Sequence, residues 1–179
     1  MAADGANYDM NGLPELLGKL ESLDFDIKRK GGRFALRRAA QVLRDQARAN
    51  AERVDDPRTT EKIAANIVER WSGRTFRKTG NMMFRVGVLG GARQYANSRE
   101  NVRKGRAGKS YLTDGDKGNP GGDTWYWRLL EFGTEHMAAQ PIFRPVPNQV
   151  GQQATDVFVK EYGKSIDRAL KRARKKAVK

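Results

Sequence analysis

Two long stretches of the chain place apolar residues three and four positions apart, which is the spacing of one helix face. In residues 33–54 this face consists of Leu36, Ala40, Leu43, Ala47, Ala51 and Val54. The opposite side carries Arg37, Arg44, Arg48 and Glu52. We interpret this stretch as a helix that packs on the core, because amphipathic stripes are usually core faces. The helix should end at Asp55-Asp56-Pro57, since a residue before proline disfavours the helical conformation.

The second stretch follows Pro147 and predicts a long amphipathic helix that runs to about Ala177. Its apolar face consists of Ala154, Val157, Phe158, Tyr162, Ile166, Ala169, Leu170 and Ala173. Basic residues crowd its last turns, where positive charge suits the helix dipole. They are Lys171, Arg172, Arg174, Lys175 and Lys176.

A shorter amphipathic segment lies before residue 33, with Leu13, Leu16, Leu17 and Leu20 on one side. Asp24 or Asp26 is the expected start of the next helix. Gly31-Gly32 should interrupt that helix or delay its start, because each glycine costs about 1 kcal/mol in a helix interior. Residues 1–11 are small and polar and are predicted to form a flexible N-terminus.

The middle of the chain predicts another helix and then a β-hairpin. Thr59 or Thr60 should cap the helix, whose apolar face would hold Ile63, Ile67 and Trp71 before Ser72-Gly73 ends it. Residues 74–78 are expected to form a strand, followed by a turn at Thr79-Gly80-Asn81. Residues 82–89 alternate apolar and polar positions and should form the partner strand.

These elements together predict an α+β fold. It would consist of N-terminal helices, a small antiparallel sheet made of a hairpin plus a short strand, and the long C-terminal amphipathic helix. A chain of 179 residues has the size of one domain, so we expect a single domain over residues 12–179. Within it, residues 92–123 show no clear periodicity and read as an extended basic insertion loop. It is either a mobile insertion or a segment that orders against neighbours, and we favour the second.

Residues 124–147 restrict the backbone more than any other stretch. The hydroxyl of Thr124 is expected to cap a short helix, on which Trp125, Leu129 and Phe132 share one face. Gly133 should follow the last turn in a left-handed conformation. The prolines at 141, 145 and 147 then fix φ and remove amide donors. This pattern predicts a chain path that is tightly specified.

Charge is high and unevenly distributed. The chain has 35 Lys and Arg against 21 Asp and Glu, a formal net charge of +14. Residues 1–27 hold six acids and one lysine, whereas residues 160–179 hold nine bases and two acids. This asymmetry suits a head-to-tail ring in which unlike surfaces meet, and it also suits binding to nucleic acid. Charge alone leaves both interpretations open.

Residues that could carry catalysis or bind metal are scarce. The chain has no cysteine and one histidine, His136, which argues against a zinc site or a catalytic triad. Asp114, Asp116 and Asp123 are better explained as solvated turn residues than as metal ligands. Glu131 lies among apolar residues and should form an ion pair or accept from backbone, with Arg144 as the candidate partner. We therefore expect neither an enzyme nor a cofactor, and no apolar run is long enough to cross a membrane.

One motif resembles a known family. Tyr126-x-x-Leu129-Leu130-Glu131-Phe132-Gly133-Thr134, followed by Ala139-Gln140-Pro141-x-Phe143-Arg144-Pro145, is similar to the signature of phage neck proteins. These are the tail-completion and head–tail joining proteins of long-tailed bacteriophages, similar to the minor tail protein Z of phage lambda. The resemblance implies a structural virion protein, assembled in the host cytoplasm. It would form a ring, six-fold rather than twelve-fold, that joins the tail tube or its terminator to the head connector or stopper.

The resemblance also suggests which residues take part. The candidate assembly residues are Trp125, Tyr126, Glu131, Phe132, Gly133, Thr134, Gln140, Pro141, Phe143, Arg144 and Pro145. Basic residues are candidates for contact with genomic DNA in the channel or with an acidic partner. They are Arg93, Arg99, Arg103, Lys104, Arg106, Lys109, Lys171, Arg172, Arg174, Lys175 and Lys176. The alternative function is a basic nucleic-acid-binding protein.

Overall fold

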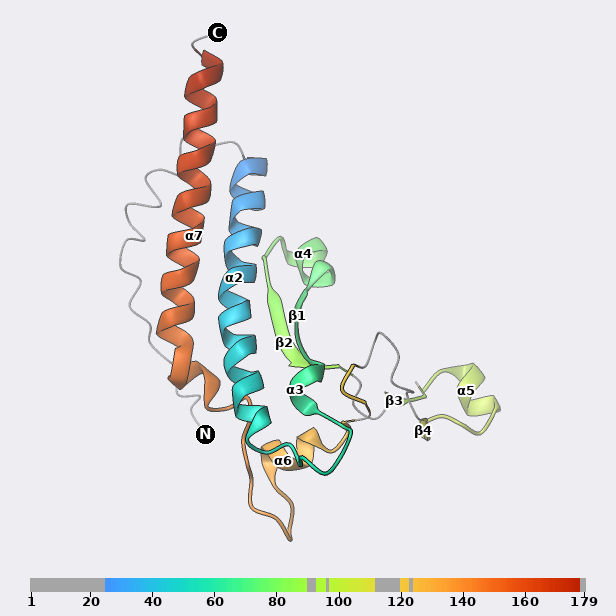
Figure 1. The fold of residues 1–179 in the computed structure, drawn as a ribbon. Coiled ribbons are helices and arrows are strands. Elements are labelled where there is room, and N and C mark those ends of the chain that lie inside the picture. Colours follow the sequence, from blue (N-terminus) through green and yellow to red (C-terminus); the bar gives the residue numbers. More distant parts are fainter. Residues whose placement is uncertain (1–24, 90–92, 96, 112–119, 123, 178–179) are drawn as a thin grey trace, which may run out of the picture. The chain divides into compact units, whose positions relative to one another are not determined.

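A computed structural model describes residues 25–89, 93–95, 97–111, 120–122 and 124–177 (Figure 1). Its elements in chain order are α2 (Phe25–Glu52), α3 (Ile63–Asn66), β1 (Ile67–Trp71), α4 (Gly73–Thr79), β2 (Phe84–Val88), β3 (Arg93–Gln94), α5 (Arg99–Arg103), β4 (Ser110–Tyr111), α6 (Trp127–Phe132) and α7 (Val146–Ala177). This arrangement confirms the predicted α+β class, the long C-terminal helix and the small antiparallel sheet.

The chain divides into two compact units. The first unit comprises Met1–Arg44, Glu69–Val86 and Val146–Lys179, and the second comprises Asp45–Val68 and Gly87–Pro145. The expectation of a single domain over 12–179 stays a prediction. The flexible segment expected at 1–11 lies outside the described residues.

In the first unit, the N-terminal half of α2 runs antiparallel beside the C-terminal half of α7 (Figure 1). Their core contains Ala35 of α2 with Tyr162, Ile166 and Ala169 of α7, and Phe158 and Leu170 pack against it. The periodicity therefore identified the apolar face of α7 correctly up to Leu170, whereas Ala173 is exposed.

The expected break at Gly31-Gly32 is wrong, because α2 continues through both glycines. A Cβ on Gly31 would lie 2.7 Å from the Ser165 Oγ, and one on Gly32 would lie 2.8 Å from the Met82 Cε. Glycine here allows close packing, which outweighs its cost within a helix.

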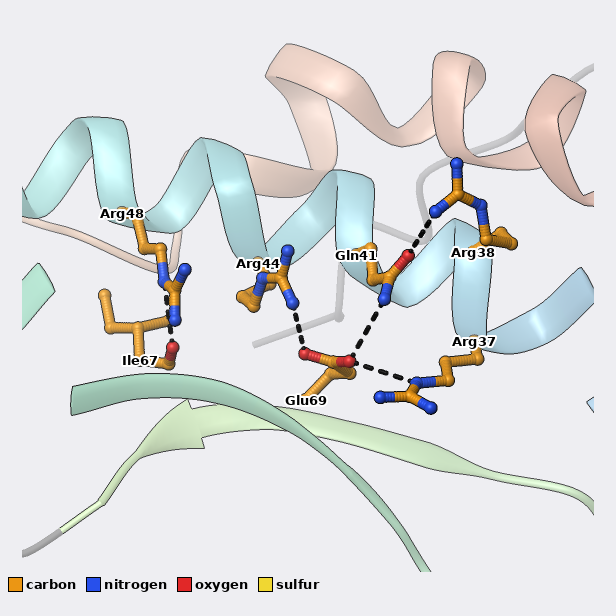
Figure 2. A network of polar contacts seen from close by, with 7 residues as sticks. All are labelled: Arg37, Arg38, Gln41, Arg44, Arg48, Ile67 and Glu69. Atoms are coloured by element: carbon orange, nitrogen blue, oxygen red, sulfur yellow. Dashed lines mark hydrogen bonds and ion pairs between the residues drawn. The ribbon is translucent and has the colours of Figure 1, made fainter. Parts of the chain in front are cut away.

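Figure 2 shows how the polar side of α2 meets β1. The Glu69 carboxylate accepts hydrogen bonds from Arg37 Nε at 3.2 Å, Gln41 Nε2 at 3.3 Å and Arg44 Nη1 at 2.6 Å. Burial by itself raises the pKa of Glu69, but these hydrogen bonds, with Arg44 the strongest, outweigh it and lower the pKa from 4.5 to about 2. In the second unit, Arg48 Nε donates to the Ile67 carbonyl at 3.0 Å. Three of the arginines on the polar face of α2 thus bind β1.

The predicted helix carrying Ile63, Ile67 and Trp71 is wrong beyond Asn66, because Ile67–Trp71 form strand β1. A spacing of four residues fits a helix, but it also fits a strand, where alternate residues share a face. The β-branched pair Ile67-Val68 and the polar partners available to Glu69 favour the strand. Thr59 and Thr60 are not the caps. The Asp55 carboxylate accepts from the α3 amides of Ile63 and Ala64 at 3.0 and 3.2 Å.

The sheet uses a different partner from the one expected. Residues 74–78 lie in helix α4, so the predicted strand there is wrong, and β2 pairs with β1 instead. The pairing is antiparallel: the Ser72 amide donates to the Met83 backbone carbonyl at 2.9 Å, and the Leu89 amide donates to the Asn66 backbone carbonyl at 2.7 Å. In the first unit, Phe76 of α4 and Phe84 of β2 both contact the Trp71 ring, at centroid distances of 5.5 and 5.3 Å. This packing accounts for the helix, and Gly80 ends it with a φ of 73° at the predicted turn.

Part of the 92–123 stretch has regular structure. β3 and β4 pair antiparallel, with Arg93 opposite Tyr111 and Gln94 opposite Ser110. The short helix α5 lies between them in the chain, and the Ser98 hydroxyl caps it by accepting from the Asn101 amide. These short elements follow no long hydrophobic repeat, so periodicity could not reveal them.

Candidate assembly interface

The Glu131 carboxylate organises the turn that follows α6. One oxygen accepts from the amides of Ile142 and Phe143 at 2.6 and 2.9 Å, and the other accepts from the Arg144 amide at 2.9 Å. The Arg144 guanidinium lies 3.5 Å from the same carboxylate and also donates to the Glu131 carbonyl. The sequence predicted either an ion pair or a backbone acceptor, with Arg144 as the candidate partner, and the structure shows both. Glu131 thus ties the end of α6 to the chain 11 to 13 residues later.

Gly133 allows the chain to reverse directly after α6. Its φ is 77°, and a Cβ there would lie 2.9 Å from both the Ala139 amide nitrogen and the Met137 carbonyl oxygen. The predicted positive φ is therefore confirmed. Thr134 and Met137 form an isolated antiparallel β-bridge, and the backbone amide of Gln140 donates to the Leu130 carbonyl at 2.7 Å. The reversal is held by backbone hydrogen bonds on both sides.

Asn66 fixes the approach to α6 and was missed from sequence. Its side-chain amide donates to the Gly122 carbonyl and to the Thr124 hydroxyl, both at 2.9 Å, and its oxygen accepts from the Gly121 amide at 2.7 Å. Asn66 and Thr124 are fully buried. The prediction that Thr124 caps α6 is wrong, because its hydroxyl is bound to Asn66. An asparagine at the end of a four-residue helix carries no sequence signal of this contact.

Asn50 supports the other end of the turn. Its side-chain amide donates to the buried carbonyl of Ile142 at 3.0 Å. Ile142 therefore has its amide bound by Glu131 and its carbonyl bound by Asn50 of α2.

Tyr126 lies just before α6. Burial raises the pKa of Tyr126, and the carboxylates of Glu61, Asp55 and Asp56 raise it further.

A cluster of apolar side chains is exposed on this framework. Trp125 is 51% exposed, Leu129 is 40% exposed and Phe132 is 68% exposed. Arg144 lies over the Phe132 ring at 5.5 Å, and Phe143 meets Trp127 edge-on at 5.7 Å. We call Trp125, Leu129 and Phe132 the apolar cluster. Leu129 and Phe132 lie three residues apart on α6, as predicted, whereas Trp125 precedes the helix, and all three side chains are exposed to solvent.

The other candidate assembly residues differ in exposure. Thr134, Gln140, Pro141 and Arg144 are exposed, whereas Tyr126, Gly133, Phe143 and Pro145 are half-buried and Glu131 is buried. All of them lie within residues 125–145 and belong to the second unit. Glu131 and Gly133 thus shape the backbone, and the exposed members are the ones available for contact.

The candidate basic residues fall into two groups. In the second unit, Arg99, Arg103, Lys104 and Lys109 are exposed, and Arg106 is half-buried with its guanidinium 4.9 Å from the Tyr95 ring. Lys104 pairs with Glu100 at 2.5 Å. In the first unit, Lys171, Arg172 and Lys175 are exposed on α7. The side chains of Arg93, Arg174 and Lys176 lie outside the described part of the chain.

Comparison with family models decides the identity. Residues 15–133, more than half of the chain, match the family HK97-gp10_like, described as "Bacteriophage HK97-gp10, putative tail-component". The chain belongs to this family. The expected resemblance to phage tail proteins is thereby confirmed. Neither a curated protein nor a solved structure matches the chain.

The HK97-gp10-like match includes α6 and ends at Gly133, so the Gln140–Pro145 part of the motif and α7 lie beyond it. Among the described residues of this tail component, no group of three or more His, Asp or Glu is placed to hold a metal ion. No described helix is both long enough and apolar enough to span a membrane.

Proposed function

We propose that this tail component is a ring subunit in the neck of a long-tailed phage. It joins the tail tube or its terminator to the head connector or stopper, in a ring that is six-fold rather than twelve-fold. Its place is in the virion, after assembly in the host cytoplasm, and its role is structural rather than enzymatic.

The observation that carries this proposal is the apolar cluster on a rigid backbone. Leu129 and Phe132 are three residues apart on α6 and both exposed, with the exposed Trp125 just before the helix, and a concentration of large exposed apolar side chains favours an interface. The Glu131 and Asn66 hydrogen bonds hold the backbone beneath them, so little conformational entropy would be lost on assembly. Exposed aromatic residues in a fixed frame are typical of binding hot spots.

The test compares Phe132→Ser with Met83→Ser, another exposed apolar residue that lies in the first unit. Light scattering after gel filtration should give a closed ring for the wild type and for Met83→Ser. Phe132→Ser should dissociate, and it should reduce the infectious titre at least about tenfold when it complements a phage that lacks the gene, since a hot-spot truncation costs about 2 kcal/mol. Normal titre and ring mass with Phe132→Ser would reject the proposal.

Nucleic-acid binding is the second candidate, favoured by the exposed cations of α5 and α7. It predicts that duplex DNA binds with an affinity that falls steeply with salt, because counterions are released from phosphates. A chain that stays monomeric and shows this salt dependence would support binding over assembly.

A further inference from the structure

Two hollows in the first unit meet at the N-terminal part of α2. One has a volume of about 410 Å³ and lies between α2 and α7, where Arg168, Arg172 and Ser165 line it. The other has a volume of about 510 Å³ and is lined by Arg33, Arg70 and Trp71. Lys30 and Phe34 line both. We call the combined surface the basic groove.

The groove joins strong positive charge to an exposed aromatic ring. Phe34 is 47% exposed, although it lies among cations. The one acid in the lining is Glu69, which is already neutralised by Arg37 and Arg44. Among the described residues, the side chains of Lys30, Arg70 and Arg172 take part in no hydrogen bond or ion pair. The groove therefore suits a partner that is acidic and carries apolar side chains.

The chain itself contains a segment of that chemistry. Residues 1–24 hold five acids and one lysine, so the rest of the chain has all but one of the 35 basic residues. Leu13, Leu16, Leu17 and Leu20 repeat at helical spacing in this segment. An acidic segment with a leucine stripe complements both the cations and Phe34. Nucleic acid would match the cations, but it would leave the leucine stripe without a role.

We propose that the basic groove binds residues 1–24 of a neighbouring copy of this chain. The inference rests on the proposed ring and specifies one contact within it. Each subunit would donate its acidic segment to the next, which is a head-to-tail contact that closes into a ring. A segment of the same chain would have to reverse within the few residues between Leu20 and Phe25, whereas the segment of a neighbouring copy can reach the groove without that turn.

Cross-linking tests this contact directly, because the chain has no cysteine. Full-length Lys19→Cys and Lys30→Cys chains, distinguished by tags, are mixed and treated with a short bismaleimide. The expected product is a covalent heterodimer. Lys78→Cys, an exposed lysine on α4, replaces Lys30→Cys as the matched control and should give little product. The absence of a heterodimer would overturn the proposal. In a chain that carries both Lys19→Cys and Lys30→Cys, a cross-link formed only within one chain would overturn it as well.

Charge reversal adds a second measurement. Arg168→Glu/Arg172→Glu should lower the heterodimer yield at least tenfold, whereas Arg74→Glu/Arg85→Glu, with the same change of charge outside the groove, should leave it unchanged. If the groove variant instead loses binding to a short DNA duplex while the cross-link persists, the occupant is nucleic acid and the proposal is wrong. A ring that depends on Phe132 but lacks the cross-link rejects this contact alone, whereas a monomer at every concentration rejects the proposed function.

Discussion

Glu69 and Glu131 are both nearly buried, with side chains 6% and 3% exposed, yet they are stabilised in different ways. Glu69 in the first unit accepts from three side chains of α2. Glu131 in the second unit accepts from three consecutive backbone amides and pairs with one arginine. The first carboxylate joins two elements, and the second defines the path of one segment.

The difference predicts different consequences when each carboxylate is lost. Arg37 can turn toward water when Glu69 is removed, because its side chain is 60% exposed, whereas Arg44 is 20% exposed and has less access to solvent. Backbone amides cannot turn away, so removing Glu131 leaves one buried and two part-buried donors without an acceptor. The turn at 131–144 should therefore depend on its glutamate more strongly than the α2–β1 contact does.

The largest expected effect follows from Glu131→Ala. It should lower the free energy of unfolding by about 3–5 kcal/mol, because the three backbone amides of 142–144 lose their acceptor. Urea unfolding followed by circular dichroism measures the loss. Glu135→Ala, an exposed glutamate on the same turn, is the control and should change little. A loss below about 1 kcal/mol for Glu131→Ala would contradict the expectation that the turn at 131–144 depends more strongly on its glutamate than the α2–β1 contact does.

The pH dependence of stability should report Glu69. Its folded pKa of about 2 lies below the ordinary value of 4.5, so its contribution is complete above pH 4.5 and is lost as the pH falls toward 2. The shift corresponds to about 3 kcal/mol. Urea unfolding at about pH 6 and about pH 3 should show a smaller acid loss in Glu69→Gln than in the wild type, because the variant has no carboxylate to protonate there. Equal losses of stability in the two proteins would show that Glu69 does not contribute to the pH dependence.

Gly133→Ala should cost about 2–3 kcal/mol, because it adds backbone strain at positive φ to a clash. The matched variant is Gly80→Ala, which has a similar φ of 73° but nothing within 4 Å of the added Cβ. It should cost about 1 kcal/mol through strain alone. The difference between the two in thermal or urea unfolding measures the clash with Met137 and Ala139 together with the extra backbone strain at Gly133, where ψ is 177° rather than the −10° of Gly80. Equal costs would exclude both.

The smallest effect is expected from deleting residues 171–179. Lys171, Arg172 and Lys175 are exposed, and the α7 core residues end at Ala169 and Leu170. The deletion should lower stability by less than about 1 kcal/mol, since surface changes usually have small effects. A shift of the urea midpoint corresponding to more than about 2 kcal/mol would show that this end packs more tightly than its exposure indicates.

The amino-acid sequence by itself determined the long helices, the positive φ of Gly133 and the pairing of Glu131 with Arg144. Periodicity identified α7 and most of α2, because each buries a repeating stripe whose spacing is visible in one dimension. Glu131 was recognisable because a carboxylate among apolar residues needs a partner, and Arg144 lies close in the chain.

The tertiary structure decided the features that depend on distant residues. Ile67–Trp71 is a strand because Glu69 meets Arg37, Gln41 and Arg44 of another element. Gly31-Gly32 stay helical because α7 and Met82 pack closely against them. Thr124 binds Asn66, 58 residues away, rather than capping its own helix. In each case local preference is worth about 1 kcal/mol or less, and a buried hydrogen bond or close packing contact outweighs it.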